Sequence, residues 1–192
     1  MKNAWKLIVV IGLALLFGSK LIYDFQKSNP ISQTEISDLP IGISKGEQAP
    51  DFVGTTLDGE AIKLSDLRGK TVVINVFASW CGPCRIEAPH LAQVYANFIG
   101  QDVEFIGLNF EERPEDVAAF KDEFGWKFPV VLNQNGDLTE IYQPLGLPTS
   151  WLIDRDGVIQ YVHTGPVTAE MLAQAIMDIQ KGDDPVAVIH LD

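Results

Sequence analysis

Apolar residues form two kinds of pattern in this chain, and the two alternate from about residue 47 onward. Short continuous apolar runs are typical of strands covered on both faces, and strands are predicted at 71–77, 103–108, 130–132, 149–153 and 158–162. Apolar positions with helical spacing predict helices after Cys81, from Pro114 and after Thr168, which is expected to cap the last one. This order predicts an α/β fold, in which helices flank a mixed central sheet.

Two turn signals complete this pattern. Leu57-Asp58-Gly59 separates the segments 49–52 and 60–64 and predicts an N-terminal β-hairpin. Asp154-Arg155-Asp156-Gly157 joins the last two predicted strands. It lacks the third acidic residue and the distant glutamate of a calcium loop, so we interpret it as a turn.

The first 27 residues have a different pattern, in which lysines flank a long apolar segment. Ala4–Tyr23 would span ~30 Å as a helix, which matches the hydrocarbon core of a bilayer. We expect an uncleaved transmembrane signal-anchor, because no convincing small-residue cleavage site follows the apolar run; a cleaved signal peptide is the alternative. Lys2 and Lys6 favour a single-pass inner-membrane protein whose globular domain lies in the periplasm or elsewhere outside the cytoplasm.

The rest of the chain divides by composition. Residues 28–46 are polar and are interpreted as a linker, 47–182 as one globular domain and 183–192 as a C-terminal tail. The 192 residues are 46% hydrophobic, which is enough to fill a packed core. Beyond residue 27 the chain has 10 basic and 25 acidic residues. Because such a surface repels phosphates, we expect no nucleic-acid partner.

The only two cysteines, Cys81 and Cys84, lie between the strand at 71–77 and the helix that follows it. This places Cys81 at a helix N-terminus, where unpaired N–H groups and the helix dipole stabilise a thiolate. Cys84 lies one turn further on and can attack a mixed disulfide formed at Cys81, so the pattern favours dithiol–disulfide exchange. A zinc site would need two more ligands, and the three histidines are too scattered to supply them. A purely structural disulfide is the other alternative, but so short a loop gains little stability from one.

These residues resemble the thioredoxin superfamily, and within it the membrane-tethered TlpA/ResA/DsbE-like branch. The resemblance covers about 47–182 and rests on Ala49-Pro50-Asp51-Phe52, Trp80-Cys81-Gly82-Pro83-Cys84-Arg85 with Glu87 and Pro89 behind it, and Gly146-Leu147-Pro148-Thr149. It implies a thioredoxin-like fold with an N-terminal hairpin and a central helical insertion, after one transmembrane helix. It also implies reductive work outside the cytoplasm, often on the cysteines of apocytochromes c before haem attachment.

The resemblance also implies roles for single residues. Cys81 would be the nucleophile, Cys84 the resolving thiol and Pro148 a cis-proline beside them. The cis turn would offer a backbone edge to an extended substrate chain. The expected substrate-binding residues are Trp80, Gly82, Pro83, Leu147, Pro148 and Thr149.

Proton handling at Cys84 needs a separate group. Cytosolic thioredoxins have a buried aspartate six residues before the first cysteine, where this chain has Asn75, which cannot ionise. Glu112 matches a functional glutamate of the ResA-like proteins, and we hypothesise that it is the base for Cys84. The alternative is a carboxylate at the start of the helix at Pro114. Glu87 is expected in the first turn of the helix after Cys81, as a supporting residue.

We therefore expect a thiol-disulfide oxidoreductase that needs no metal and no cofactor beyond the Cys81–Cys84 disulfide. Its partners would be protein disulfides, with apocytochrome c as one candidate, and a membrane thiol-disulfide electron donor. The enzymatic alternatives are a disulfide isomerase, an oxidase and a peroxiredoxin-type peroxidase. The non-enzymatic alternative is a membrane-tethered binding module, which would require inert thiols.

Overall fold

The computed structural model describes residues 39–133 and 136–185. The predicted membrane anchor at 1–27 and most of the linker lie outside the described residues, as does the tail beyond residue 185. No helix in the described part of the chain is long and apolar enough to cross a membrane.

Seven strands form one mixed sheet in the order β2-β1-β5-β4-β3-β6-β7. The buried strand β3 lies near the middle, parallel to β4 and antiparallel to β6. The first two strands pair as the predicted antiparallel hairpin. The strands are β1 Val53–Thr56, β2 Ala61–Lys63, β3 Thr71–Phe77, β4 Val103–Asn109, β5 Val130–Leu132, β6 Thr149–Ile153 and β7 Ile159–Thr164.

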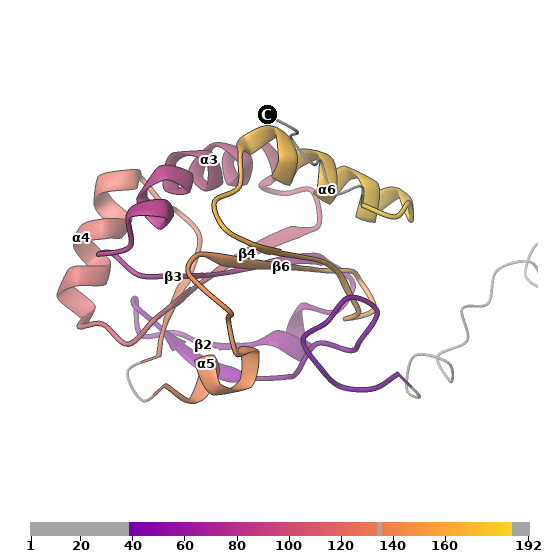
Figure 1. The fold of residues 1–192 in the computed structure, drawn as a ribbon, viewed down its shortest axis with the longest axis horizontal. Coiled ribbons are helices and arrows are strands. Elements are labelled where there is room, and N and C mark those ends of the chain that lie inside the picture. The colour runs from indigo at the N-terminus through magenta and orange to yellow at the C-terminus, as the bar shows by residue number, and fades with distance from the viewer. Residues whose placement is uncertain (1–38, 134–135, 186–192) are drawn as a thin grey trace, which may run out of the picture. The chain divides into compact units, whose positions relative to one another are not determined.

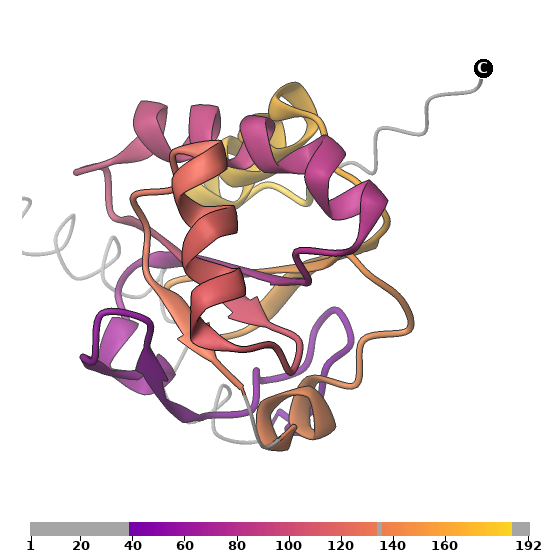
Figure 2. The ribbon, with the colours of Figure 1, turned by 90° about the vertical axis from the view of Figure 1, so that its left-hand side faces the viewer.

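The helices lie on both faces of this sheet. Figure 1 shows α3, α4 and α6 on one face, with α5 on the other. Figure 2, turned by 90°, shows the same division, with α5 in orange at the bottom of the view. The helices are η1 Leu64–Leu67 (a short 3-10 helix), α3 Gly82–Phe98, α4 Pro114–Phe124, α5 Asp137–Tyr142 and α6 Ala169–Lys181.

Each face of the sheet has its own hydrophobic core. Under α3, α4 and α6, the rings of Phe77 and Phe120 pack on Trp126 with centroid distances of 4.8 and 5.1 Å. On the α5 side, Tyr142 packs against Phe52 and Trp151. Because β3 is buried on both faces, the end of this strand is a rigid starting point for the segment that follows it.

Most of the predicted elements are confirmed, with differences at their ends. The strands predicted at 71–77, 130–132 and 149–153 have the predicted bounds, and Thr168 caps α6 by accepting a hydrogen bond from the Met171 N–H. The first hairpin strand starts only at Val53, although Ala49 and Phe52 are buried beneath the sheet. The short helices η1 and α5 were not predicted, and the insertion between β4 and β6 contributes strand β5 as well as helices.

Candidate active site

The two cysteines are joined in a disulfide at the start of α3, in the position that the sequence predicts. Cys81 is the N-cap residue of the helix, and the backbone N–H of Cys84 donates to Cys81 Sγ at 3.3 Å. The Cα atoms are 5.3 Å apart. Cys81 Sγ therefore lies where the first N–H groups of α3 can stabilise a negative charge on sulfur. Within the described ranges, no group of three or more histidine, cysteine or acidic residues could hold a metal ion.

The surface around the disulfide is exposed and apolar, although the cysteines themselves are buried. Cys81 is 5% exposed and Cys84 only 1%, whereas Trp80 is 67% exposed. Gly82 and Pro83 are also exposed, and Ile86, which carries no signal of its own in the sequence, is 64% exposed. A protein chain that reaches Cys81 would therefore contact an apolar rim.

The predicted cis peptide is present at Leu147-Pro148, directly before β6. Since Thr149 pairs with Val76 near the end of β3, this loop lies beside the segment that leads to the cysteines. The Pro148 carbonyl accepts a hydrogen bond from the Gly165 N–H, whereas within the described residues no hydrogen bond engages the backbone of Leu147. Thr149 is buried and its hydroxyl donates to the Gly146 carbonyl at 2.7 Å, so its side chain shapes the loop and does not face the surface.

Glu87 is not in the first turn of α3, so that prediction is wrong. The helix begins at Gly82, and Glu87 lies in its second turn, on the buried face that also carries Cys84. Its side chain is 1% exposed and accepts hydrogen bonds from the Val167 N–H at 3.0 Å and from Asn75 Nδ2 at 2.7 Å. Burial raises the pKa of Glu87 to about 7, and this effect is larger than that of the two hydrogen bonds, which lower the pKa. A carboxyl group whose pKa is raised to about 7 thus lies one helical turn from Cys84.

Asn75 connects this carboxyl group to strand β6. Its Nδ2 donates to Glu87 and also to the buried Ser150 Oγ at 3.0 Å, while its buried Oδ1 has no hydrogen-bond partner in the described part of the chain. Asn75 could be identified from the sequence, but Ser150 and Val167 could not, because they lie more than 60 residues away along the chain. The three-residue spacing from Cys84 to Glu87 was the available signal, because residues at i and i+3 share a helix face.

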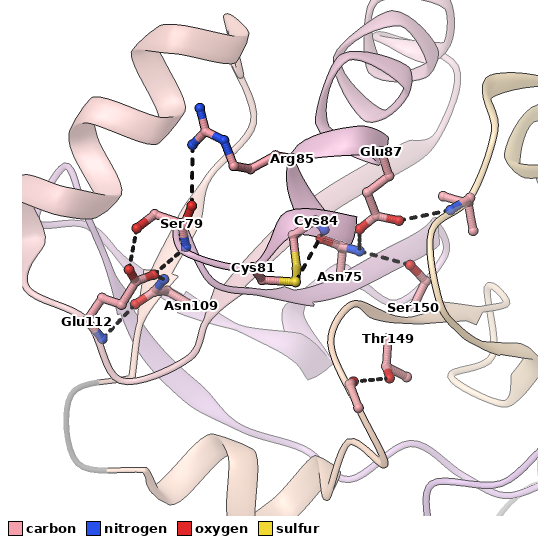
Figure 3. Close-up of a disulfide and its surroundings, with 12 residues drawn as sticks. Asn75, Ser79, Cys81, Cys84, Arg85, Glu87, Asn109, Glu112, Thr149 and Ser150 are labelled. Carbon is pink, nitrogen blue, oxygen red and sulfur yellow. Dashed lines mark hydrogen bonds between the residues drawn. A yellow bond between two sulfur atoms is a disulfide. The ribbon is translucent and has the colours of Figure 1, made fainter.

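Glu112 lies on the other side of the motif, beyond Ser79 (Figure 3). The ends of β3 and β4 lie side by side, since Phe77 pairs with Asn109. A positive φ of 54° at Glu111 turns the chain there. The Glu112 carboxylate then accepts from the Ser79 N–H at 2.7 Å, from the Ser79 hydroxyl and from Asn109 Nδ2 at 2.7 Å.

These contacts hold the loop that leads into Cys81. The Ser79 carbonyl also accepts from Arg85 at 3.3 Å, and the Arg85 guanidinium lies 5.1 Å from the centre of the Phe124 ring and pairs with Glu123. Ser79 is therefore held on both sides, between the start of α4 and the first turns of α3. Within the described residues Glu112 makes no capping hydrogen bond to α4. Its predicted role as a base for Cys84 stays a prediction.

Comparison with known proteins agrees with this geometry. A model of the AhpC/TSA family matches residues 45–162. The thiol-disulfide oxidoreductase ResA of Bacillus subtilis (strain 168) is 38% identical over 141 residues, which cover 73% of this chain and 79% of that protein. The crystal structure of a thioredoxin-family thiol:disulfide interchange protein from Chlorobium tepidum TLS has a TM-score of 0.65 and 28% identity, and covers 71% of this chain and 97% of that one.

The structure of StoA from Bacillus subtilis is also similar, with a TM-score of 0.58 and 29% identity over 65% of this chain and 94% of that one. The family match at residues 45–162 contains strands β1 to β6, the disulfide and the cis-proline loop described above. The chain belongs to the AhpC/TSA family of thioredoxin-like proteins and is a thiol-disulfide oxidoreductase similar to ResA.

Proposed function

We propose that this enzyme reduces disulfides in other proteins from an N-terminal membrane anchor outside the cytoplasm, with the cysteine pair of apocytochrome c as its substrate. The observation that carries the proposal is the Cys81–Cys84 disulfide at the N-terminus of α3, beneath an exposed apolar rim. The apolar segment at 1–27 supports the anchor, and the similarity to a thiol-disulfide oxidoreductase supports dithiol–disulfide exchange at Cys81 and Cys84.

The reaction has two exchange steps. In the first, the Cys81 thiolate attacks one sulfur of the substrate disulfide, forming a mixed disulfide and releasing the other substrate sulfur as a thiolate. In the second, Cys84 loses its proton and attacks Cys81 Sγ, which forms the disulfide seen in the structure and releases the second substrate thiolate. A membrane dithiol donor then returns two electrons and two protons to the enzyme.

Substrate positioning would come from the backbone of the cis-proline loop. Since the N–H and C=O of Leu147 have no hydrogen-bond partner within the described residues, they are free to pair with an extended peptide. Trp80 and Ile86 offer apolar contacts on the other side of Cys81. This arrangement recognises an unfolded or extended cysteine-containing segment more readily than a small thiol.

Glu87 is the group best placed to take the proton of Cys84. It lies one turn further along the same buried helix face, and its raised pKa of about 7 lets it hold or release a proton near neutral pH. Glu112, by comparison, has both oxygens engaged by Ser79 and Asn109. We therefore assign Glu112 to holding the loop before Cys81 and keep its action as a base as a hypothesis for mutational test.

A trapping experiment tests the substrate class. Cys84→Ser leaves Cys81 able to form the mixed disulfide but unable to release it, so substrates accumulate covalently on the full-length protein in the membrane. Apocytochrome c among the trapped proteins would support the proposal, and Cys81→Ser is the matched control that should trap nothing. A broad set of secreted proteins without cytochromes would instead indicate a general reductase or isomerase.

A further inference from the structure

Asn75 is hydrogen-bonded to Glu87 and cannot itself carry a proton. It lies on β3, 2% exposed, beneath the buried face of α3 that carries Cys84 and Glu87 (Figure 3). Its side-chain amide makes two hydrogen bonds, both through Nδ2, to Glu87 Oε1 and to Ser150 Oγ. Its Oδ1 makes none.

The orientation of this amide is set by Glu87. An ionised carboxylate can only accept hydrogen bonds, so it requires Nδ2 on its side of the amide. Ser150 does not fix the orientation of the amide, because a hydroxyl group can either donate or accept a hydrogen bond. The consequence of this orientation is a buried carbonyl oxygen without a donor, which is unfavourable in a protein interior.

Protonation of Glu87 on the oxygen that faces Asn75 reverses this requirement. The new O–H group would point at the Nδ2 hydrogens, so that two hydrogen-bond donors would face each other and no hydrogen bond could form. A half-turn of the amide places Oδ1 where it can accept from Glu87 and from the Ser150 hydroxyl. The same half-turn moves Nδ2 to the place that Oδ1 occupied, on the side of the amide away from Glu87 and Ser150.

We propose that Asn75 is a positioning residue whose side-chain amide turns over when the proton of Cys84 passes to Glu87. Before the transfer, Oδ1 is available to accept a hydrogen bond from the Cys84 thiol while Nδ2 binds the Glu87 carboxylate. After it, Oδ1 accepts from the Glu87 O–H and Nδ2 donates to the Cys84 thiolate, which stabilises the charge before it attacks Cys81. The inference rests on the proposed role of Glu87. It adds that Asn75 can hydrogen-bond to Glu87 in both of its protonation states.

Few groups contact Glu87, so the Asn75 side-chain amide is the group that can rearrange when Glu87 is protonated. Asn75 faces it from β3 and the Val167 N–H from the segment before α6, while Ser150 on β6 reaches it through Asn75. No charged side chain pairs with Glu87 within the described residues, and only burial and these two hydrogen bonds shift its titration. Val167 cannot change its role, because a backbone N–H only donates.

NMR of the reduced full-length protein in detergent tests the turn directly. Both Nδ2 protons of Asn75 should change resonance with the same midpoint as the Glu87 carboxyl carbon, because both lose their present partners. An amide that stays fixed would keep its bond to Ser150, so a shift of only the proton that faces Glu87 would overturn the inference. This readout does not depend on any substrate, and it can fail while the proposed function stands.

A double-mutant cycle on the rate of the Cys84 step gives a second test. Asn75→Leu should slow this step at least tenfold, and combining it with Glu87→Gln should slow it no further than Glu87→Gln does alone. Thr71→Val is the matched control, since Thr71 is on the same strand and also has a buried, unpartnered oxygen. Thr71→Val should leave the rate unchanged. Additive effects of Asn75→Leu and Glu87→Gln would contradict the inference, because Asn75 would then act independently of the carboxyl group.

Discussion

Glu87→Gln should make the stability of this protein less dependent on pH, by an amount that the structure allows us to estimate. The pKa of Glu87 is about 7 in the folded protein, against an ordinary value of 4.5. Because the folded state holds the proton more tightly, this group's contribution is complete below pH 4.5 and is lost as the pH rises to about 7. At about 1.36 kcal/mol per pH unit, the loss is on the order of 3 kcal/mol.

Glutamine keeps the shape of the protonated acid, and Asn75 can accommodate it by presenting its free Oδ1. Urea unfolding of the oxidised full-length protein in detergent tests this from pH 4.5 to 8.5. The free energy of unfolding of Glu87→Gln, relative to that of the wild type, should rise with pH until about pH 7 and stay constant above it. The reasoning is refuted if the difference between the two proteins is flat across this range, since all other titrating groups are common to both. Glu60→Gln, which removes an exposed acid from the N-terminal hairpin, is a control that should show no such trend.

Three further changes probe the surroundings of the motif. Trp80→Ala removes a side chain that is 67% exposed, so the free energy of unfolding should change by less than about 0.5 kcal/mol while KM for a protein disulfide rises, as insulin-reduction kinetics would reveal. Glu112→Gln weakens the hold on Ser79 and should slow exchange and shift the thiol titration; an unchanged titration would remove Glu112 from proton handling. Thr168→Ala removes the cap of α6 and should lower the free energy of unfolding by about 1 kcal/mol without changing the exchange rate, and a loss of activity at full stability would show that the cap does more.

The sheet and the position of the cysteines could be predicted because their signals are local. A buried strand has a continuous apolar sequence. The bounds of β3 and β6 that this pattern predicts are the bounds found in the structure. The helix start at Cys81 follows from the strand before it and the helical spacing after it. The short helix α5 gave no such signal, because six residues are too few to establish a periodic pattern.

The proton-handling residues were harder to predict because their environment is assembled from distant segments. Glu87 looked like an ordinary acid near the start of a helix, a place where carboxylates are common. Its burial depends on β3, β6 and the segment before α6, which come together only in the folded protein. Glu112 lies just beyond the end of β4, but its contact with Ser79 depends on the turn at Glu111, which no residue type in the sequence predicts.

The acidity of the Cys81 thiol is the most direct test of the whole account. In reduced Cys84→Ser protein, the rate of alkylation by iodoacetamide should be followed from pH 4 to 10. The position of Cys81 at the N-terminus of α3 predicts a midpoint at least one pH unit below the value of about 8.5 for a free cysteine. A midpoint at or above 8.5 would contradict the assignment of Cys81 as the attacking nucleophile.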